Sequence, residues 1–274
     1  MKRSIALALV LTVCSAGLAF GQVKAKDGLY FAQEAAYAKD SGWKDQVIVG
    51  VKGGKIVSVD WNGVSNTGVA DKLTAVAAGG YPMVKFGKAK AEWDVQAKAV
   101  EDYLLKTQDT GFNKYSNAEG RTDAISGASI HVKPFFTLVN AALASAPVSK
   151  GIYKKDGWFF KEQAAFDKST GWKDSVLLTV VNGTIVDALW NGVSSDKTKK
   201  SKLVEDLAGK YGMEKAAKKG AWNVQAAAVQ NAIVKVQDPA KIAMKADGTT
   251  DAISGASMHA TAVVLAIEAL KAAR

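Results

Sequence analysis

An internal repeat constrains this sequence more than any other feature. Residues 61–65 (WNGVS) return as residues 190–194, and residues 122–129 (TDAISGAS) return unchanged as residues 250–257. The offset is 129 positions for the first pair and 128 for the second, so one net insertion or deletion separates the copies. This self-similarity predicts two copies of one domain of about 120 residues, which is a common domain size.

Each copy opens with segments typical of β-strands. Apolar residues alternate around positions 53–54 (Gly-Gly) and 182–183 (Asn-Gly). Asn-Gly favours the positive φ angles of a tight hairpin turn, so we predict a hairpin at each place. The segments that begin at Leu29 and Trp158 are expected to add a third strand to each hairpin.

Helices are predicted after the strands of each copy. Short helices are expected near residues 72–78 and 202–211, and the last helix of each copy is expected to begin at the runs 126–129 and 254–257. Strands followed by helices predict an α+β fold in which each repeat is an antiparallel sheet with packed helices. The clearest helical stripe has residues three or four positions apart; it consists of Trp93, Ala97, Val100 and Leu104 in the first copy and Trp222, Ala226, Val229 and Ile233 in the second.

The repeated tryptophans have two interpretations. Core packing is the favoured one because an indole buries a large apolar area, and stacking on a ligand is the alternative. The Asn-Gly pairs at 62–63 and 191–192, which follow two of these tryptophans, are expected to be turns that end strands. The four tryptophans are Trp61, Trp93, Trp190 and Trp222.

The first 21 residues have the pattern of an export signal. Lys2 and Arg3 precede an apolar run at 5–13, and small residues favour cleavage after Gly21. Cys14 offers an alternative, in which this cysteine is acylated and anchors a lipoprotein. Either way the protein is expected in the periplasm or at the cell surface. The predicted parts are a signal peptide at 1–21, a first domain at 22–147 and a second domain at 151–274.

Charge and composition exclude several classes of protein. The chain has 36 basic and 26 acidic residues, and loss of the signal leaves 34 basic residues and a net charge of +8. Such a surface suits an acidic partner protein or an anionic membrane surface, whereas no basic motif indicates nucleic acid. One cysteine and two histidines predict no metal site. The tightest basic cluster consists of Lys197, Lys199, Lys200 and Lys202.

The longest identical run is polar and small, so core packing does not explain its repetition. One interpretation is a helix start capped by the first serine of the run, but several residue types can cap a helix. Gly127 permits the close approach of a ligand, Ala128 is small, and Ser129 presents a hydroxyl where a helix N-terminus would favour a phosphate. The run therefore predicts a phosphate held at, or bonded to, Ser129 and Ser257.

The same run resembles the acceptor motif of FMN-binding domain proteins. That family includes the flavin subunits of the bacterial Nqr and Rnf electron-transport complexes and exported proteins with tandem domains. The resemblance implies that a flavin transferase, using FAD and magnesium, attaches FMN through a phosphodiester to the last motif residue, which is Ser here and more often Thr in the family. The implied positions are Asp123, Ser126, Gly127, Ala128 and the acceptor Ser129 in the first copy, and Asp251, Ser254, Gly255, Ala256 and the acceptor Ser257 in the second.

The resemblance implies two covalent FMN groups per chain and a role as an extracytoplasmic electron carrier rather than an enzyme with its own substrate. Covalent attachment would prevent loss of the flavin after export. The expected partners are a flavin transferase and redox proteins that donate and accept electrons. His131 and His259 either contact the flavin or are ordinary residues of a helix start. The alternatives are a ligand-binding or surface protein without redox activity, and an extracellular reductase.

Overall fold

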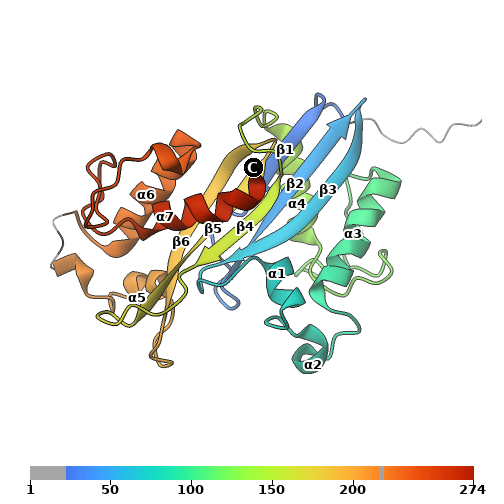
Figure 1. Cartoon of the computed structure of the whole chain (residues 1–274). Coiled ribbons are helices and arrows are strands. Elements are labelled where there is room, and N and C mark those ends of the chain that lie inside the picture. Colours follow the sequence, from blue (N-terminus) through green and yellow to red (C-terminus); the bar gives the residue numbers. More distant parts are fainter. Residues whose placement is uncertain (1–22, 216, 218) are drawn as a thin grey trace, which may run out of the picture.

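The computed structural model describes residues 23–274 except 216 and 218, and it contains two halves that each carry one sheet (Figure 1). The predicted signal peptide and Cys14 lie outside the described residues. The two sheets lie against each other in the middle of the molecule, with α3 (Trp93–Thr107) on one side and α6 (Trp222–Val236) and α7 (Thr261–Ala269) on the other. The predicted α+β class with antiparallel sheets is confirmed.

The first sheet is an antiparallel arrangement of three strands in the order β1-β2-β3. The strands are β1 (Gly28–Gln33), β2 (Trp43–Lys52) and β3 (Lys55–Ser65). Gly53 and Gly54 form the predicted hairpin turn between β2 and β3, with φ angles of 59° and 72° that favour glycine.

The second sheet has the same arrangement, in the order β4-β5-β6. Its strands are β4 (Gly157–Glu162), β5 (Trp172–Val181) and β6 (Thr184–Ser194). Asn182 and Gly183 form its hairpin turn at φ angles of 52° and 73°, as the Asn-Gly pair predicts. The strand register shifts at Gly50/Val51 in one sheet and at the equivalent Thr179/Val180 in the other, so even this irregularity is repeated.

Helices cover one face of each sheet. In the first half α3 packs on β3, and α4 packs on β1 and β2; in the second half α6 packs on β6, and α7 packs on β4 and β5. The helices of the first half are α1 (Lys72–Ala77), α2 (Met83–Gly87), α3 (Trp93–Thr107) and α4 (Lys133–Ala144). Those of the second half are α5 (Lys202–Leu207), η1 (Met213–Lys215), α6 (Trp222–Val236), η2 (Pro239–Lys241), α7 (Thr261–Ala269) and η3 (Leu270–Ala273).

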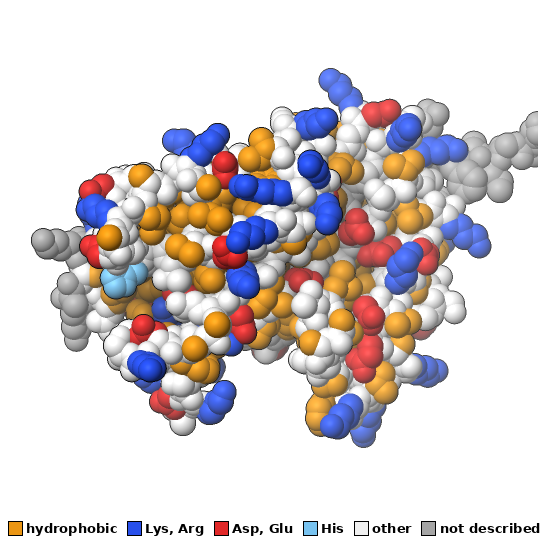
Figure 2. All heavy atoms as spheres, in the orientation of Figure 1, with side chains coloured by type: hydrophobic (Ala, Val, Ile, Leu, Met, Phe, Trp, Pro, Cys, Tyr) orange, Lys and Arg blue, Asp and Glu red, His pale blue; other side chains and the backbone are white. Residues whose placement is uncertain are grey.

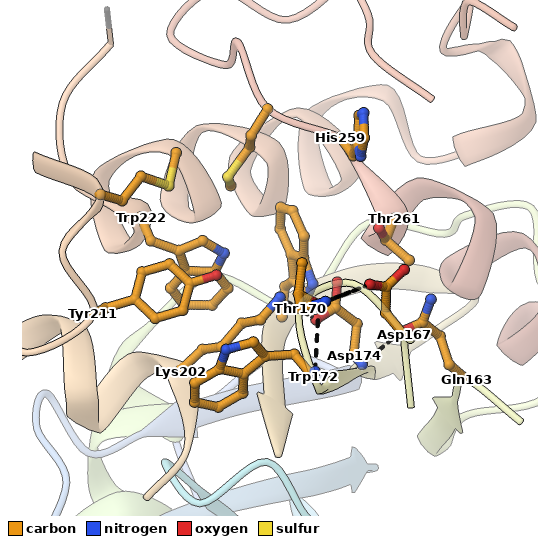
Figure 3. A pocket seen from close by; sticks show the side chains of 13 residues that line it. Gln163, Asp167, Thr170, Trp172, Asp174, Lys202, Tyr211, Trp222, His259 and Thr261 are labelled. Carbon is orange, nitrogen blue, oxygen red and sulfur yellow. Dashed lines mark hydrogen bonds and ion pairs between the residues drawn. The ribbon is translucent and has the colours of Figure 1, made fainter. Parts of the chain in front are cut away.

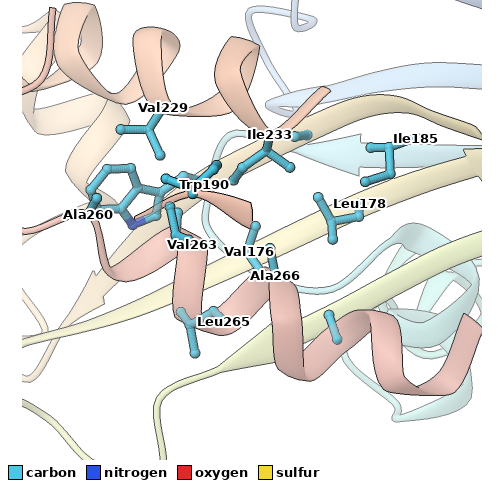
Figure 4. Packing of buried hydrophobic residues seen from close by; sticks show 14 of the residues in the cluster. Val176, Leu178, Ile185, Trp190, Val229, Ile233, Ala260, Val263, Leu265 and Ala266 are labelled. Carbon is cyan, nitrogen blue, oxygen red and sulfur yellow. The ribbon is translucent and has the colours of Figure 1, made fainter. Parts of the chain in front are cut away.

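Each half has its own hydrophobic core between the sheet and the helices. Trp61 and Trp93 are buried in one core, with ring centroids 5.3 Å apart, and Trp190 and Trp222 are buried in the other at 5.4 Å. Figure 4 shows Trp190 between α6 and α7, close to Val263. The favoured interpretation of the four tryptophans as core residues is therefore correct.

The opposite faces of the sheets meet at the junction of the two halves. Val64, Leu177 and Leu189 form a small apolar cluster there. The buried side chain of Gln46 joins the halves, because its Oε1 accepts from Trp158 Nε1 at 2.6 Å and its Nε2 donates to Asp187 at 2.8 Å. The junction therefore combines apolar packing with buried hydrogen bonds.

Two sequence-based expectations about local structure are wrong. The last helix of each half begins at Lys133 and Thr261, several residues after the repeated run, because Gly127 and Gly255 adopt φ angles of 89° and 93° that no helix contains. The Asn-Gly pairs that begin at Asn62 and Asn191 lie within β3 and β6 and do not end these strands.

The outer surface is mixed in charge. Figure 2 shows Lys and Arg side chains scattered over the face drawn, with Asp and Glu between them. Within residues 23–274, apart from the two left out, no helix is long and apolar enough to cross a membrane.

Candidate functional site

The repeated run forms the same loop in both halves. Thr122 Oγ1 donates to the carbonyl of Lys114 at 2.5 Å and accepts from the Ala124 amide, and Thr250 makes the equivalent pair of bonds. The side chain of Ile125 is buried in the core of its half. The hydrogen bonds of Thr122 and the buried side chain of Ile125 thus hold the loop in place, and Ser129 at its end is exposed.

The two predicted acceptor serines are held by a buried glutamine. The amide and the hydroxyl of Ser129 both donate to Oε1 of Gln96, at 2.7 and 2.9 Å. Ser257 makes the same two bonds to Gln225, at 2.8 and 3.2 Å. This glutamine was not among the predicted site residues, although Gln96 and Gln225 are repeated together with Trp93 and Trp222, and this repetition is the signal that could have identified them.

A cavity opens beside the loop in the first half. Its volume is about 570 Å³, within the range of pockets that hold small ligands. Ser129 and His131 line it, and so does Arg121, whose guanidinium donates to the Ser129 carbonyl at 2.8 Å. The predicted acceptor therefore lies at the wall of a cavity large enough for a cofactor.

The second half has a cavity at the equivalent place, shown in Figure 3. Its volume is smaller, about 190 Å³, and His259 lies at its edge. Ser257 does not line this cavity directly, although the following residue, Met258, does. The residues that occupy equivalent positions in both cavities are Trp43, Asp45, Trp61, Lys72, Tyr81, Met83, Trp93 and His131 in the first half, and Trp172, Asp174, Trp190, Lys202, Tyr211, Met213, Trp222 and His259 in the second.

A buried ion pair lies in the wall of each cavity. Lys72 Nζ is 3.0 Å from Asp45 Oδ1, and both side chains are almost fully buried, at 7% and 14% exposed. The matching pair, Lys202 and Asp174, is 2.5 Å apart, with side chains 10% and 7% exposed. Burial removes much of the hydration of both charges, and this cost can exceed the attraction between them. A contribution to stability therefore does not by itself explain the ion pair.

Aromatic rings surround each of these lysines. Lys72 Nζ lies 4.6 to 5.9 Å from the ring centroids of Trp43, Tyr81 and Trp93. In Figure 3 the Lys202 side chain passes between Trp172 on one side and Tyr211 and Trp222 on the other. Burial, followed by the nearby Asp174 and Asp206 carboxylates, raises the pKa of Tyr211 to about 12, so this phenol remains a hydrogen-bond donor at neutral pH.

The repeated Asn-Gly pair positions the lysine. Asn62 Oδ1 accepts from the Leu73 amide at 3.1 Å, which holds the start of α1, and Asn191 does the same for α5 through Leu203. A Cβ on Gly63 would lie 2.8 Å from Lys72 Cε, so a larger residue there would displace the end of the lysine side chain. The pair therefore belongs to the construction of the cavity wall.

Three buried side-chain atoms have no hydrogen-bond partner within the described residues: Asp94 Oδ1 and the indole Nε1 atoms of Trp61 and Trp190. The two tryptophans line the cavities. A buried N–H without a partner is costly, so its presence at the same position in both halves fits an absent ligand or water. The residues of the larger cavity, in the first half, thus offer aromatic side chains, hydrogen-bond donors and one cation, which would suit a flat, polar-edged ring such as a flavin.

The other predicted site residues lie on the exposed side of the loop. Asp123, Ser126 and Ser254 are exposed, and Asp251 forms an exposed ion pair with Lys245 at 2.7 Å. Ala128 is partly buried and Ala256 is buried. The structure therefore brings Ser129 and both histidines to the cavities, leaves Ser257 next to a lining residue, and leaves the two aspartates accessible from outside.

The predicted lysine cluster is divided by the fold. Lys202 is buried in its ion pair, whereas Lys197, Lys199 and Lys200 line a separate cavity of about 500 Å³ together with Lys39 of the first half. In the part of the chain that the structure describes, no group of three or more His, Cys, Asp or Glu residues could hold a metal ion.

Comparisons with known proteins give structural neighbours without a stated function. A solution NMR structure of a Clostridium thermocellum protein is 52% identical and covers 43% of this chain and 89% of its own, with a TM-score of 0.35. A crystal structure of a Clostridium perfringens protein is 23% identical and covers 44% and 89%, also with a TM-score of 0.35. No protein-family model and no curated protein matches the chain.

Proposed function

We propose that this protein is an extracytoplasmic electron-transfer flavoprotein that carries FMN covalently on Ser129 and Ser257. The observation that carries the proposal is the repetition of one constellation: a serine held by a buried glutamine, beside a cavity walled by tryptophans and a buried lysine. A repeated run of small polar residues supports the same acceptor role, because packing alone does not require it.

The residues present define where each part of the cofactor would be held. Ser129 would bond the phosphate, and the Arg121 guanidinium beside it is suited to bind phosphate oxygens. Trp43, which is partly exposed, offers an aromatic face for the ring, and Lys72 offers a cation. The bound flavin would supply reversible uptake of electrons, which no side chain provides.

The surroundings of the serine fit an acceptor that another enzyme modifies. Within the described residues, the hydroxyl of Ser129 is hydrogen-bonded only to the neutral amide oxygen of Gln96. A nucleophilic serine that acts by itself needs an adjacent base such as histidine. The exposed Asp123 and Ser126 remain accessible to a flavin transferase.

The charge of the surface supports one class of redox partner. The cavity between the halves, lined by Lys39, Lys197, Lys199 and Lys200, supports an acidic protein as electron donor or acceptor. The net positive charge also suits an anionic membrane surface in the periplasm or at the cell exterior.

Intact mass tests the proposal. The protein is co-expressed with a flavin transferase, denatured and weighed. We expect two additions, each of FMN less one water, with Ser129→Ala and Ser257→Ala removing one each. Ser149→Ala, at an exposed serine outside the repeated run, is the matched control and should remove neither. An unmodified mass alongside an active transferase would overturn the covalent flavoprotein.

A second candidate function is supported by the smaller cavity of the second half. A volume of about 190 Å³ lies below the usual range for ligand pockets, which favours a non-redox role for that half, with a smaller ligand or none. A single FMN addition that only Ser129→Ala removes would support this division of roles.

A further inference from the structure

The buried lysine of each cavity has hydrogen-bonding capacity that the described residues do not use. An ammonium has three N–H donors. Within the described part of the chain, Lys72 donates only to Asp45 and Lys202 only to Asp174. Both side chains are at least nine-tenths buried and both residues line a cavity.

Neighbouring residues hold this lysine in place, although burial of its charge is unfavourable. Gly63 and Gly192 leave the space for its aliphatic chain, and Asn62 holds the helix start from which Lys72 projects. Burial of a paired charge is often neutral or unfavourable compared with apolar packing. A purely structural wall could therefore use an apolar residue, and its repetition as lysine indicates a ligand-directed charge.

We propose that Lys72 and Lys202 stabilise negative charge on the reduced flavin ring in their cavities and so raise its reduction potential. This inference rests on the proposed function and names the residues that regulate the same site. When an oxidised flavin takes up two electrons and one proton, its net charge becomes one unit more negative. A cation in a poorly solvated cavity favours that product over the oxidised ring, without transferring a proton itself.

Asp45 makes the sign of the effect testable. If the ammonium acts on the ring, removal of the lysine lowers the potential and removal of the carboxylate raises it. If the ion pair is only structural, both changes disturb the cavity in the same way. The pair in the second half, Lys202 and Asp174, allows the same test on the other flavin.

The experiment measures midpoint potentials of the flavinylated protein in a Ser257→Ala background, with dithionite as reductant and a reference dye. For Lys72→Met we expect at least a tenfold lower ratio of reduced to oxidised flavin at fixed potential, which is a decrease of about 30 mV for a two-electron couple. For Asp45→Asn we expect a change of similar size in the opposite direction. The double variant should lie close to the parent, and it keeps the test possible if Lys72→Met alone does not fold.

Lys98→Met is the matched control. It removes an equal charge from an exposed lysine on α3 that pairs with Asp102 and does not line the cavity. We expect less than a twofold change in the ratio. Equal shifts for Lys98→Met and Lys72→Met, or shifts of the same sign for Lys72→Met and Asp45→Asn, would overturn the inference.

A second measurement separates this inference from the covalent attachment. Unmodified Ser129→Ala/Ser257→Ala protein is titrated with oxidised and with dithionite-reduced FMN, and binding is followed by tryptophan fluorescence. Lys72→Met should weaken the binding of reduced FMN at least tenfold more than that of oxidised FMN. If the co-expressed protein keeps an unmodified mass, but Lys72→Met still weakens the binding of reduced FMN more than that of oxidised FMN, only the covalent flavoprotein is rejected. If FMN does not bind saturably, or if Lys72→Met weakens both forms equally, the role of the lysine is rejected.

Discussion

The two halves of the molecule keep the same scaffold and differ at the mouth of the cavity. The tryptophan pair has nearly the same geometry in both, with interplanar angles of 67° and 65°, and each half repeats the glutamine, the lysine and the aspartate. The cavities, however, measure about 570 and 190 Å³, and Arg121 has a threonine, Thr249, as its counterpart. The two copies therefore agree more closely in the wall of the site than at its opening.

The largest expected effect tests the shared scaffold. Trp61→Ala and Trp190→Ala should each reduce the free energy of unfolding by about 3–5 kcal/mol, because each removes a fully buried indole and leaves a cavity. Urea unfolding followed by circular dichroism measures the loss. Phe86→Ala, at a side chain that is 73% exposed, is the control and should change the free energy by less than about 0.5 kcal/mol. If the substitution in one half leaves the free energy of unfolding unchanged, the two scaffolds are not equivalent.

A smaller effect is expected where the halves differ in a single buried group. Glu101 accepts a hydrogen bond from the Trp61 amide at 2.7 Å, and Gln230 accepts the equivalent bond from Trp190 at 2.7 Å. Burial, with the nearby Asp60 as a lesser cause, raises the pKa of Glu101 from 4.5 to about 7. The glutamine has no charge to desolvate, so only the first half contains this titrating group.

This difference predicts a pH dependence. The folded state holds the Glu101 proton more tightly than the unfolded chain, so its contribution to stability is present at low pH and is lost as pH rises from about 4.5 to 7. Glu101→Gln should therefore stabilise the protein above pH 7, by up to about 3 kcal/mol, and have little effect at pH 4.5. Urea unfolding at the two pH values measures this.

The reverse exchange is the matched control. Gln230→Glu should introduce a destabilisation above pH 7 in the second half, although a smaller one, because Leu189 stands where Asp60 stands in the first half. A Glu101→Gln variant with the same stability difference from the parent at both pH values would contradict the raised pKa.

The sequence predicted the regular parts of the fold better than the site. Gly53-Gly54 and Asn182-Gly183 predicted the hairpins because turn conformation depends on these residues alone. The stripe from Trp93 to Leu104 predicted α3 because its spacing follows the helical period. The predicted start of α4 was wrong, since the loop before it is fixed by contacts with residues distant in the chain, such as that of Ser129 with Gln96.

Local sequence patterns did not predict which residues form the wall of the cavity. Lys72 and Asp45 are far apart in the chain, and only the folding of α1 onto β3 brings them together. Lys202 was grouped with its exposed neighbours because charge spacing does not reveal which lysine is buried. Repetition of Asn62-Gly63 and Gln96 was visible, but its meaning depended on the partners that the fold supplies.

The smallest expected change in stability tests the mouth of the cavity. Arg121 is exposed and donates to the Ser129 carbonyl, so Arg121→Thr should alter the free energy of unfolding by less than about 0.5 kcal/mol. The guanidinium is suited to hold a phosphate beside the acceptor, so the same variant should slow flavin attachment to Ser129 severalfold. The time course of the mass increase, in a Ser257→Ala background, measures this rate. The mirror variant Thr249→Arg, in a Ser129→Ala background, should speed attachment to Ser257. If neither exchange changes its rate, the wider cavity rather than the arginine distinguishes the two acceptors.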